Sequence, residues 1–158
     1  MRLCNETITV FNARVDPGTG GKAWVPTVIA GAGWYATDAT TVDGARGGLV
    51  AADRVTVRIP EDADAGGKAY VDPVAYAGAE SVEGVWTLAN GDVVVRGEVA
   101  SPSAPSPSAQ ALTPPPEGEA SAWTPAALSR AFAECVTVLA VTDNRRAPNA
   151  RHWRVVGA

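Results

Sequence analysis

"RVTVRIP" (Arg54–Pro60) is the stretch that predicts the fold most directly. Val55, Val57 and Ile59 alternate with polar side chains, which is the period-two pattern of a strand with one buried face. Pro60 cannot donate a ladder hydrogen bond, so we expect the strand to end there. The stretch therefore indicates a sheet that covers a core on one side and faces solvent on the other.

Runs of the same alternating or β-branched kind lie on both sides of this strand. Together they predict seven or eight short strands: Thr7–Phe11, a bent strand at 24–37 with Pro26 at an edge or bulge and Gly31 and Gly33 at the bend, two runs within 83–99, Cys135–Val141 and 151–156. Asn90-Gly91 predicts a two-residue hairpin between the two runs of 83–99. We expect residues 40–53 to form a loop and 61–80 an acidic, glycine-rich connection.

One helix is predicted, after residue 123. Thr124 is a good N-cap and Pro125 suits the first helical position, where its missing N–H is not needed. Trp123 is expected to pack on Leu128 as a hydrophobic staple. The buried stripe of the helix is expected to consist of Leu128, Ala131 and Phe132.

Residues 101–122 differ in composition from the rest of the chain. They hold six of the twelve prolines and almost no large apolar side chain. Such a segment cannot bury enough surface to offset its ordering entropy, so it predicts an extended, mobile insertion. We therefore expect one domain over 1–158, mainly β, built as a small antiparallel β-barrel or sandwich with one short helix and a long Pro/Ser-rich insertion.

Composition limits the possible functions. The sequence pI of about 4.9 argues against a protein that binds nucleic acid through a broad basic face. Cys4 and Cys135 are the only cysteines and form no CxxC pair, so we expect two reduced thiols in a reducing cytoplasm and no zinc site. No apolar run approaches a membrane span, and the N-terminus has no apolar signal core, so we expect neither a membrane anchor nor export.

Three stretches could suggest chemistry, and each has a simpler structural interpretation. His152, the lone histidine, would need a nucleophile and an acid such as Ser129 and Asp143, but no nucleophile motif frames it. Gly18–Lys22 lacks the full spacing of a phosphate loop, so a hairpin tip is favoured. Glu61–Gly66 lacks the bidentate glutamate of a calcium loop, so a solvated acidic loop is favoured. We expect no enzyme activity, no cofactor and no metal.

The chain contains five tryptophans but only two phenylalanines. Most of them are expected in the core, and Trp86 in particular, because it opens a run with apolar neighbours. A buried tryptophan can also anchor an interface. Trp34 and Tyr35, if exposed together, would suit a ligand-binding module.

Several segments together resemble a known class of proteins. They are "ITVFN", "TVIAGAGWY", "AADRVTVRIP", "WTLANGDVVVRGEV" and "VTDNRRAPNARHWRVVGA". This series resembles the small minor structural proteins of the phage head-to-tail region, and more broadly the head-completion, or stopper, proteins of the head–tail joining group. The resemblance covers most of 5–100 and 123–158, and none of its motifs is catalytic.

The resemblance implies a virion structural connector. It implies a small β-barrel that assembles as a homo-oligomeric ring of six or twelve copies at the portal vertex, closes the DNA-filled head and joins it to the tail. Its partners would be a portal or adaptor ring above and a tail-completion or tail-terminator ring below. Double-stranded DNA would pass through without sequence-specific binding. The protein would be made in the host cytoplasm and reside in the virion neck.

Positive charge gathers at the C-terminal end. Residues 143–158 hold four arginines and one acid, net +3, whereas the other 142 residues hold nine basic and sixteen acidic residues, net −7. A solvated turn would explain the arginines, but arginine also pairs carboxylates well at interfaces. The expected protein-interface residues are Arg145, Arg146, Arg151, His152, Trp153 and Arg154. Arg145 and Arg146 are expected to reach carboxylates of an adjacent subunit or ring.

Two other functions remain open from the sequence. One is a tail-completion protein one ring further along the particle. The other is a small carbohydrate- or ligand-binding β module, for which Trp34 and Tyr35 would be the platform.

Overall fold

A computed structural model describes residues 4–15, 20, 22–37, 40–43, 48–51, 54–99 and 124–158. In this part of the chain there are ten strands and two helices: β1 (Glu6–Val15), β2 (Lys22–Thr37), β3 (Thr40–Asp43), β4 (Gly48–Ala51), β5 (Arg54–Pro60), β6 (Ala69–Tyr70), α1 (Pro73–Gly78), β7 (Val85–Trp86), β8 (Val93–Arg96), α2 (Pro125–Ala131), β9 (Cys135–Asp143) and β10 (His152–Gly157). The prediction of a mainly β, mostly antiparallel protein is confirmed.

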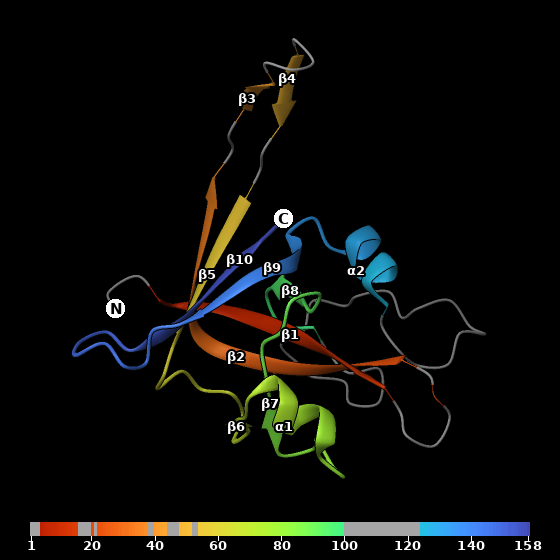
Figure 1. The fold of residues 1–158 in the computed structure, drawn as a ribbon, viewed down its shortest axis with the longest axis vertical. Helices are drawn as coiled ribbons and strands as arrows, with labels where there is room; N and C mark the ends of the chain where they lie inside the picture. Colours follow the sequence, from red (N-terminus) through yellow and green to blue (C-terminus); the bar gives the residue numbers. More distant parts are fainter. Residues whose placement is uncertain are drawn as a thin grey trace.

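Six of the strands form one antiparallel sheet that closes on itself (Figure 1). Its order is β1-β2-β5-β10-β9-β8, and β8 pairs back onto β1. We call it the closed sheet. β2 is long enough to pair with β1 through residues 22–32 and with β5 through 33–37. Gly31, with φ of 88°, lies where β2 changes partner and adopts a conformation that favours glycine.

The interior of the closed sheet is the main core. The alternation seen in Arg54–Pro60 is confirmed, since Val57 and Ile59 are fully buried while Arg54 and Arg58 are exposed. Similar inward-facing residues come from every strand of the sheet, and Trp86 and Trp153 lie among them. Trp86 is 3% exposed, so its predicted place in the core is confirmed.

A second, smaller core lies on the other face of β1 and β8, under α2. Phe11, Val93 and Val95 pack there against Leu128. The predicted cap of α2 is confirmed, because the Thr124 hydroxyl accepts from the Ala127 N–H at 3.2 Å. The stripe is partly wrong: Leu128 and Phe132 do pack inward, but Ala131 is exposed and Ala127 takes its place.

Two stretches differ from the expectation of irregular structure. The predicted loop at 40–53 contains β3 and β4, which pair antiparallel and project from the body as a ribbon beyond β2 and β5 (Figure 1). The predicted connection at 61–80 contains β6 and the helix α1, whose N-cap is Asp72 and whose first residue is Pro73. The chain therefore has two helices in its described part, not one.

The predicted hairpin at Asn90-Gly91 is wrong, although the turn exists. The Asp92 N–H donates to Ala89 O at 3.1 Å, but β7 pairs in parallel with β6 and β8 pairs with β1 and β9. The Gly91 N–H donates to Val138 O on β9 at 2.8 Å, so the turn is held by a distant strand. The expected insertion 101–122, the turn Asp16–Gly18 and the staple residue Trp123 lie outside the described residues.

The expectation for Pro26 is confirmed. Pro26 lies in the half of β2 that pairs only with β1, so the missing N–H breaks no ladder. The Lys68 ammonium donates to Pro26 O at 3.0 Å, which places the 61–70 segment along this open edge. Cys4 and Cys135 form no disulfide, as expected.

Candidate functional site

The arginine-rich end is the turn between β9 and β10, and it lies beside the segment that follows β5. The Asn144 N–H donates to His152 O at 2.9 Å and closes the turn. The Glu61 N–H donates to Arg151 O at 3.0 Å and joins the turn to β5. The six predicted interface residues therefore do lie in one region, at one end of the closed sheet.

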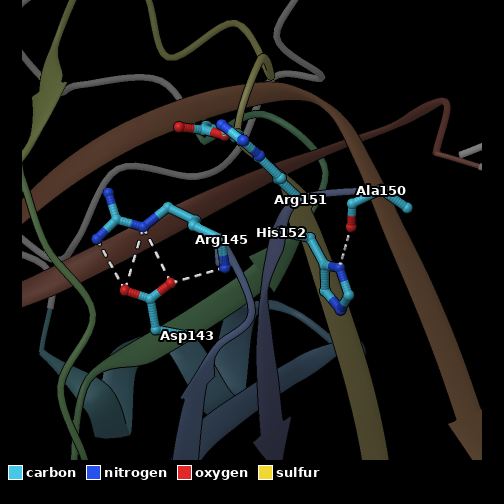
Figure 2. Close-up of polar contacts among 6 residues, drawn as sticks. Asp143, Arg145, Ala150, Arg151 and His152 are labelled. Atoms are coloured by element: carbon cyan, nitrogen blue, oxygen red, sulfur yellow. Dashed lines mark hydrogen bonds and ion pairs between the residues drawn. The ribbon is translucent and has the colours of Figure 1, made fainter. Parts of the chain in front are cut away.

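Arg145 already has a carboxylate partner within its own chain (Figure 2). Its Nη2 donates to Asp143 Oδ2 at 2.7 Å and its Nε donates to Asp143 Oδ1 at 3.0 Å. These hydrogen bonds hold the pKa of Asp143 below its usual value. The expectation that Arg145 is reserved for a neighbouring subunit therefore has a competitor in the chain itself.

The Arg145 guanidinium also covers the aromatic residues at this end of the core. It lies 5.0 Å from the Tyr70 ring centre and 4.8 Å from that of Trp153. A cation over aromatic faces is attracted by the ring quadrupole. Arg145 thus closes the end of the core, with Asp143 holding its side chain in place.

Arg145→Ala should lower the free energy of unfolding by about 1 kcal/mol, because it removes two cation–π contacts from a half-exposed site. Arg146→Ala is the matched control, because Arg146 is exposed and makes no hydrogen bond or ion pair with a described residue. It should change stability by less than about 0.5 kcal/mol. Urea unfolding of both variants makes the measurement. Equal effects would show that Arg145 is an ordinary solvated arginine.

The other predicted site residues divide into buried and exposed ones. Trp153 is 3% exposed and points into the core, so its ring is not available on the surface of this chain. Arg151 pairs loosely with Glu61, at 3.8 Å. Arg146 and Arg154 are exposed and make no ion pair with a described residue, although the charge of Arg146 helps to lower the pKa of Asp143.

His152 is satisfied by its own turn. Its Nδ1 lies 2.6 Å from Ala150 O (Figure 2), and its Nε2 lies 3.2 Å from Asn144 Nδ2. We assign the ring proton to Nδ1, which donates to the carbonyl, and Nε2 then accepts from the amide. Ser129 is engaged elsewhere, at Cys135. The structure does not bring together the histidine, serine and acid that a triad would need.

Sequence reasoning missed one feature of this region, a pair of facing arginines. Arg58 on β5 is the register partner of Arg154 on β10. Their neighbours Val57 and Val155 point into the core, so both arginines point outward. Directly opposed residues have Cβ atoms about 4.5–5.5 Å apart, and like charges there are destabilising. The signal was available only from the pairing of two strands nearly a hundred residues apart.

A model of a family described as "Family of unknown function (DUF6751)" matches residues 3–158. The chain belongs to this family. Comparisons with curated proteins and with solved structures found no match.

This DUF6751 member has one open hollow beside the arginine-rich end and a second that shares Pro60 and Asp62 with it. One, of about 480 Å³, lies between the β9–β10 turn and Pro60–Asp62, and the other, of about 450 Å³, is lined by Cys4, Gly31 and Asp64 among others. In the described part of the chain, no three His, Cys, Asp or Glu side chains gather in a way that could hold a metal ion. None of the helices described has the length and apolarity to span a membrane.

The platform expected for a ligand-binding module is not present as such in the DUF6751 chain. Trp34 packs against the main core and is half-buried. Tyr35 lies on the outer face, where the Arg58 guanidinium is 5.5 Å from its ring centre. The two rings therefore face opposite sides of β2 and do not form one stacking surface.

Proposed function

We propose that this chain is a structural subunit of the virion neck, a head-completion protein that assembles as a ring at the portal vertex and joins the DNA-filled head to the tail. The sequence resemblance to phage head–tail joining proteins supports this function. We infer that the closed sheet is the small β-barrel of such a subunit. The observation that carries the proposal is the projecting β3–β4 ribbon.

The ribbon has the properties of an assembly arm. β3 and β4 pair with each other and, among the described residues, with no further strand. A two-stranded ribbon is at best marginally stable in water, and both of its edges present unpaired N–H and C=O groups. Such edges are completed by strands of another chain, which adds main-chain hydrogen bonds across an interface. The ribbon stands at one end of the long axis of the molecule, clear of the body (Figure 1).

The charge distribution suits the same role. The chain is acidic overall, with a formal net charge of −4, and an acidic wall repels DNA that passes along it. Arg146 and Arg154 are exposed and can meet carboxylates of adjacent subunits. Arg145 pairs with Asp143 of its own chain, so we do not propose it as a contact to a neighbouring subunit.

The test is whether the protein is present in particles and whether the ribbon is needed there. Thr37 and Arg54 lie opposite each other, so Asn-Gly can replace residues 38–53 as a two-residue turn between β2 and β5. Tailed particles from a lysate of the encoding strain should contain the wild-type chain by mass spectrometry, with antibody label at the portal vertex. The shortened chain should fold but be missing from particles.

Arg130→Ala, an exposed change on α2, is the control for a surface change that leaves the ribbon intact, and the amount of this variant in particles should stay near that of wild type. Absence of the wild-type chain from purified particles would overturn the proposed function. Normal incorporation of the shortened chain would show that the ribbon is not needed for assembly, and the ribbon would then no longer support the proposed function.

A further inference from the structure

The outer face of β5 and β10 carries positive charge that no carboxylate in the described part of the chain neutralises. Arg58 and Arg154 face each other across the two strands, and Arg54 lies on the same face of β5. The outward residues between and beside them are uncharged: Tyr35, Thr56, Thr142 and Val156. In the described part of the chain, neither Arg58 nor Arg154 has a carboxylate within ion-pair distance. We call this face the arginine face.

Several other arginines of the same chain are paired with carboxylate or carbonyl oxygens. Arg96 bridges two carboxylates, with Glu6 Oε1 at 2.7 Å and Glu134 Oε1 at 2.9 Å. Arg145 is paired with Asp143 in the same way. Arg14 donates to the carbonyl oxygens of Ala79 and Glu80. The arginine face differs from these three, and the cost of its two facing like charges would be relieved by carboxylates from outside.

At a different place, the described part of the chain has carboxylates without a basic partner among the described residues. Glu80 and Glu83 follow α1 and are exposed, and their side chains make no ion pair with a described residue. α1 lies at the end of the long axis opposite the β3–β4 ribbon (Figure 1). The backbone here is anchored, because Arg14 holds the Ala79 and Glu80 carbonyls and the Val85 N–H donates to Val82 O at 3.4 Å. We call Glu80–Glu83 the acidic segment.

We propose that the arginine face binds the acidic segment of a second copy of this chain. The contact rests on the proposed function, since it names the surfaces through which neighbouring subunits would meet. Two different patches of one chain form a heterologous, head-to-tail contact, which closes into a ring when the rotation between copies permits. Planar guanidinium groups suit carboxylates because they can donate two parallel hydrogen bonds to each.

Duplex DNA is the rival occupant of the arginine face. Nucleic-acid binding draws its affinity from many phosphate contacts, and it needs a broad basic surface. Here Glu61, Asp62 and Asp64 follow directly after β5, and the chain is acidic as a whole. Two or three arginines among such neighbours suit a few carboxylates better than a polyanion.

The experiment uses charge reversal on each surface of the full-length chain, with self-association measured by sedimentation velocity over a range of concentrations. Wild type should associate as concentration rises. Arg154→Glu and Glu83→Arg should each weaken association about tenfold or more, because each sets like charges against each other. Arg130→Glu, an exposed change on α2, is the control for net charge and should behave as wild type.

Mixing the two variants gives the decisive result. The Arg154→Glu chain keeps an intact acidic segment, and the Glu83→Arg chain keeps an intact arginine face. An equimolar mixture should therefore recover association that neither chain shows alone. Circular dichroism should show that both variants stay folded.

Three results would overturn the contact. One is a wild-type chain that stays monomeric at all concentrations, and another is a mixture that fails to associate. The third is binding of a fluorescent 20-base-pair duplex at about 0.1 M salt that is lost in Arg154→Glu, which would assign the face to DNA. If any of these occurs while the chain is present in particles, the proposed function stands and only this contact fails.

Discussion

Trp86→Ala should lower the free energy of unfolding by about 3–5 kcal/mol, the range for removing a large buried aromatic ring. The Trp86 side chain is 3% exposed and lies inside the closed sheet. Its ring centre is 5.1 Å from that of Tyr70 and 5.3 Å from that of Trp153, and both pairs are close to edge-to-face. Such pairs add about 0.5–1.5 kcal/mol beyond the burial of apolar area.

The position of Trp86 explains why the loss should be large. β7 is two residues long and is paired only with the equally short β6. Because the ladder there is so short, burial of the Trp86 ring in the core contributes strongly to holding the segment between α1 and β8. An empty site would leave Tyr70 and Trp153 without their common neighbour.

Urea unfolding followed by circular dichroism is the measurement for Trp86→Ala. Trp153→Phe is the matched control, since Trp153 is equally buried but its Nε1 has no hydrogen-bond partner in the described structure. Phenylalanine keeps most of the ring and removes that unsatisfied donor, so it should cost far less than the alanine change at 86. An unchanged unfolding midpoint for Trp86→Ala would place the ring on the surface and favour the ligand-binding module.

The strands could be predicted because their signal is local. The bounds of Arg54–Pro60 were exact, and each of the other predicted runs contains a strand, because alternation directly reports one buried and one exposed face. The helix α1 was missed although its signal was present. "DP" at Asp72-Pro73 is an N-cap followed by a first-turn proline, the same pattern that correctly predicted α2 at Thr124-Pro125. The helix has only six residues and lies in a glycine-rich stretch, so the capping pattern was not recognised as a helix start.

The candidate site was less predictable because it depends on pairing between distant strands. That Arg58 would face Arg154 follows from the register of β5 and β10. That Arg145 would lie over the Tyr70 ring depends on where β6 packs against the β9–β10 turn. Charge counting found the basic C-terminal end but could not divide its arginines into those that serve the fold and those that face outward. The same holds for the hairpin expected at Asn90-Gly91, where a long-range bond to β9 replaced the local ladder.

The buried carboxylate of Asp92 gives the same turn a second long-range attachment, to β1. Its Oδ2 accepts from Ala89 N at 2.9 Å and from Asn12 Nδ2 at 2.8 Å, and its Oδ1 accepts from Ala13 N at 3.1 Å. The Asn12 side chain in turn reaches the backbone of Thr87, with Nδ2 at 2.6 Å from Thr87 O. One side chain thus connects the Asn90-Gly91 turn to β1. In a simple hairpin the turn would connect only the two strands on either side of it.

Asp92→Ala should therefore lower the free energy of unfolding by about 3–4 kcal/mol, since it leaves three donors without their acceptor in a buried or half-buried place. Asn12→Ala should also destabilise, and the two changes together should cost less than their sum, because both belong to one network. Asp62→Ala, at an exposed aspartate, is the control and should stay within about 0.5 kcal/mol of wild type. Additive effects of the two network changes would contradict the coupling.

The pH dependence of the same site has a definite sign. Burial raises the pKa of Asp92 above the ordinary 3.8, and the three hydrogen bonds oppose burial without cancelling it. The folded chain then binds this proton more tightly than the unfolded chain does. The contribution of the bound proton to the free energy of unfolding is therefore fully present below about pH 3.8 and is lost as pH rises through the folded-state pKa. Asp92→Asn cannot titrate, so the stability of wild type relative to this variant should fall over that interval. A relative stability that rises with pH would mean that the three donors outweigh burial and that Asp92 titrates below its ordinary value.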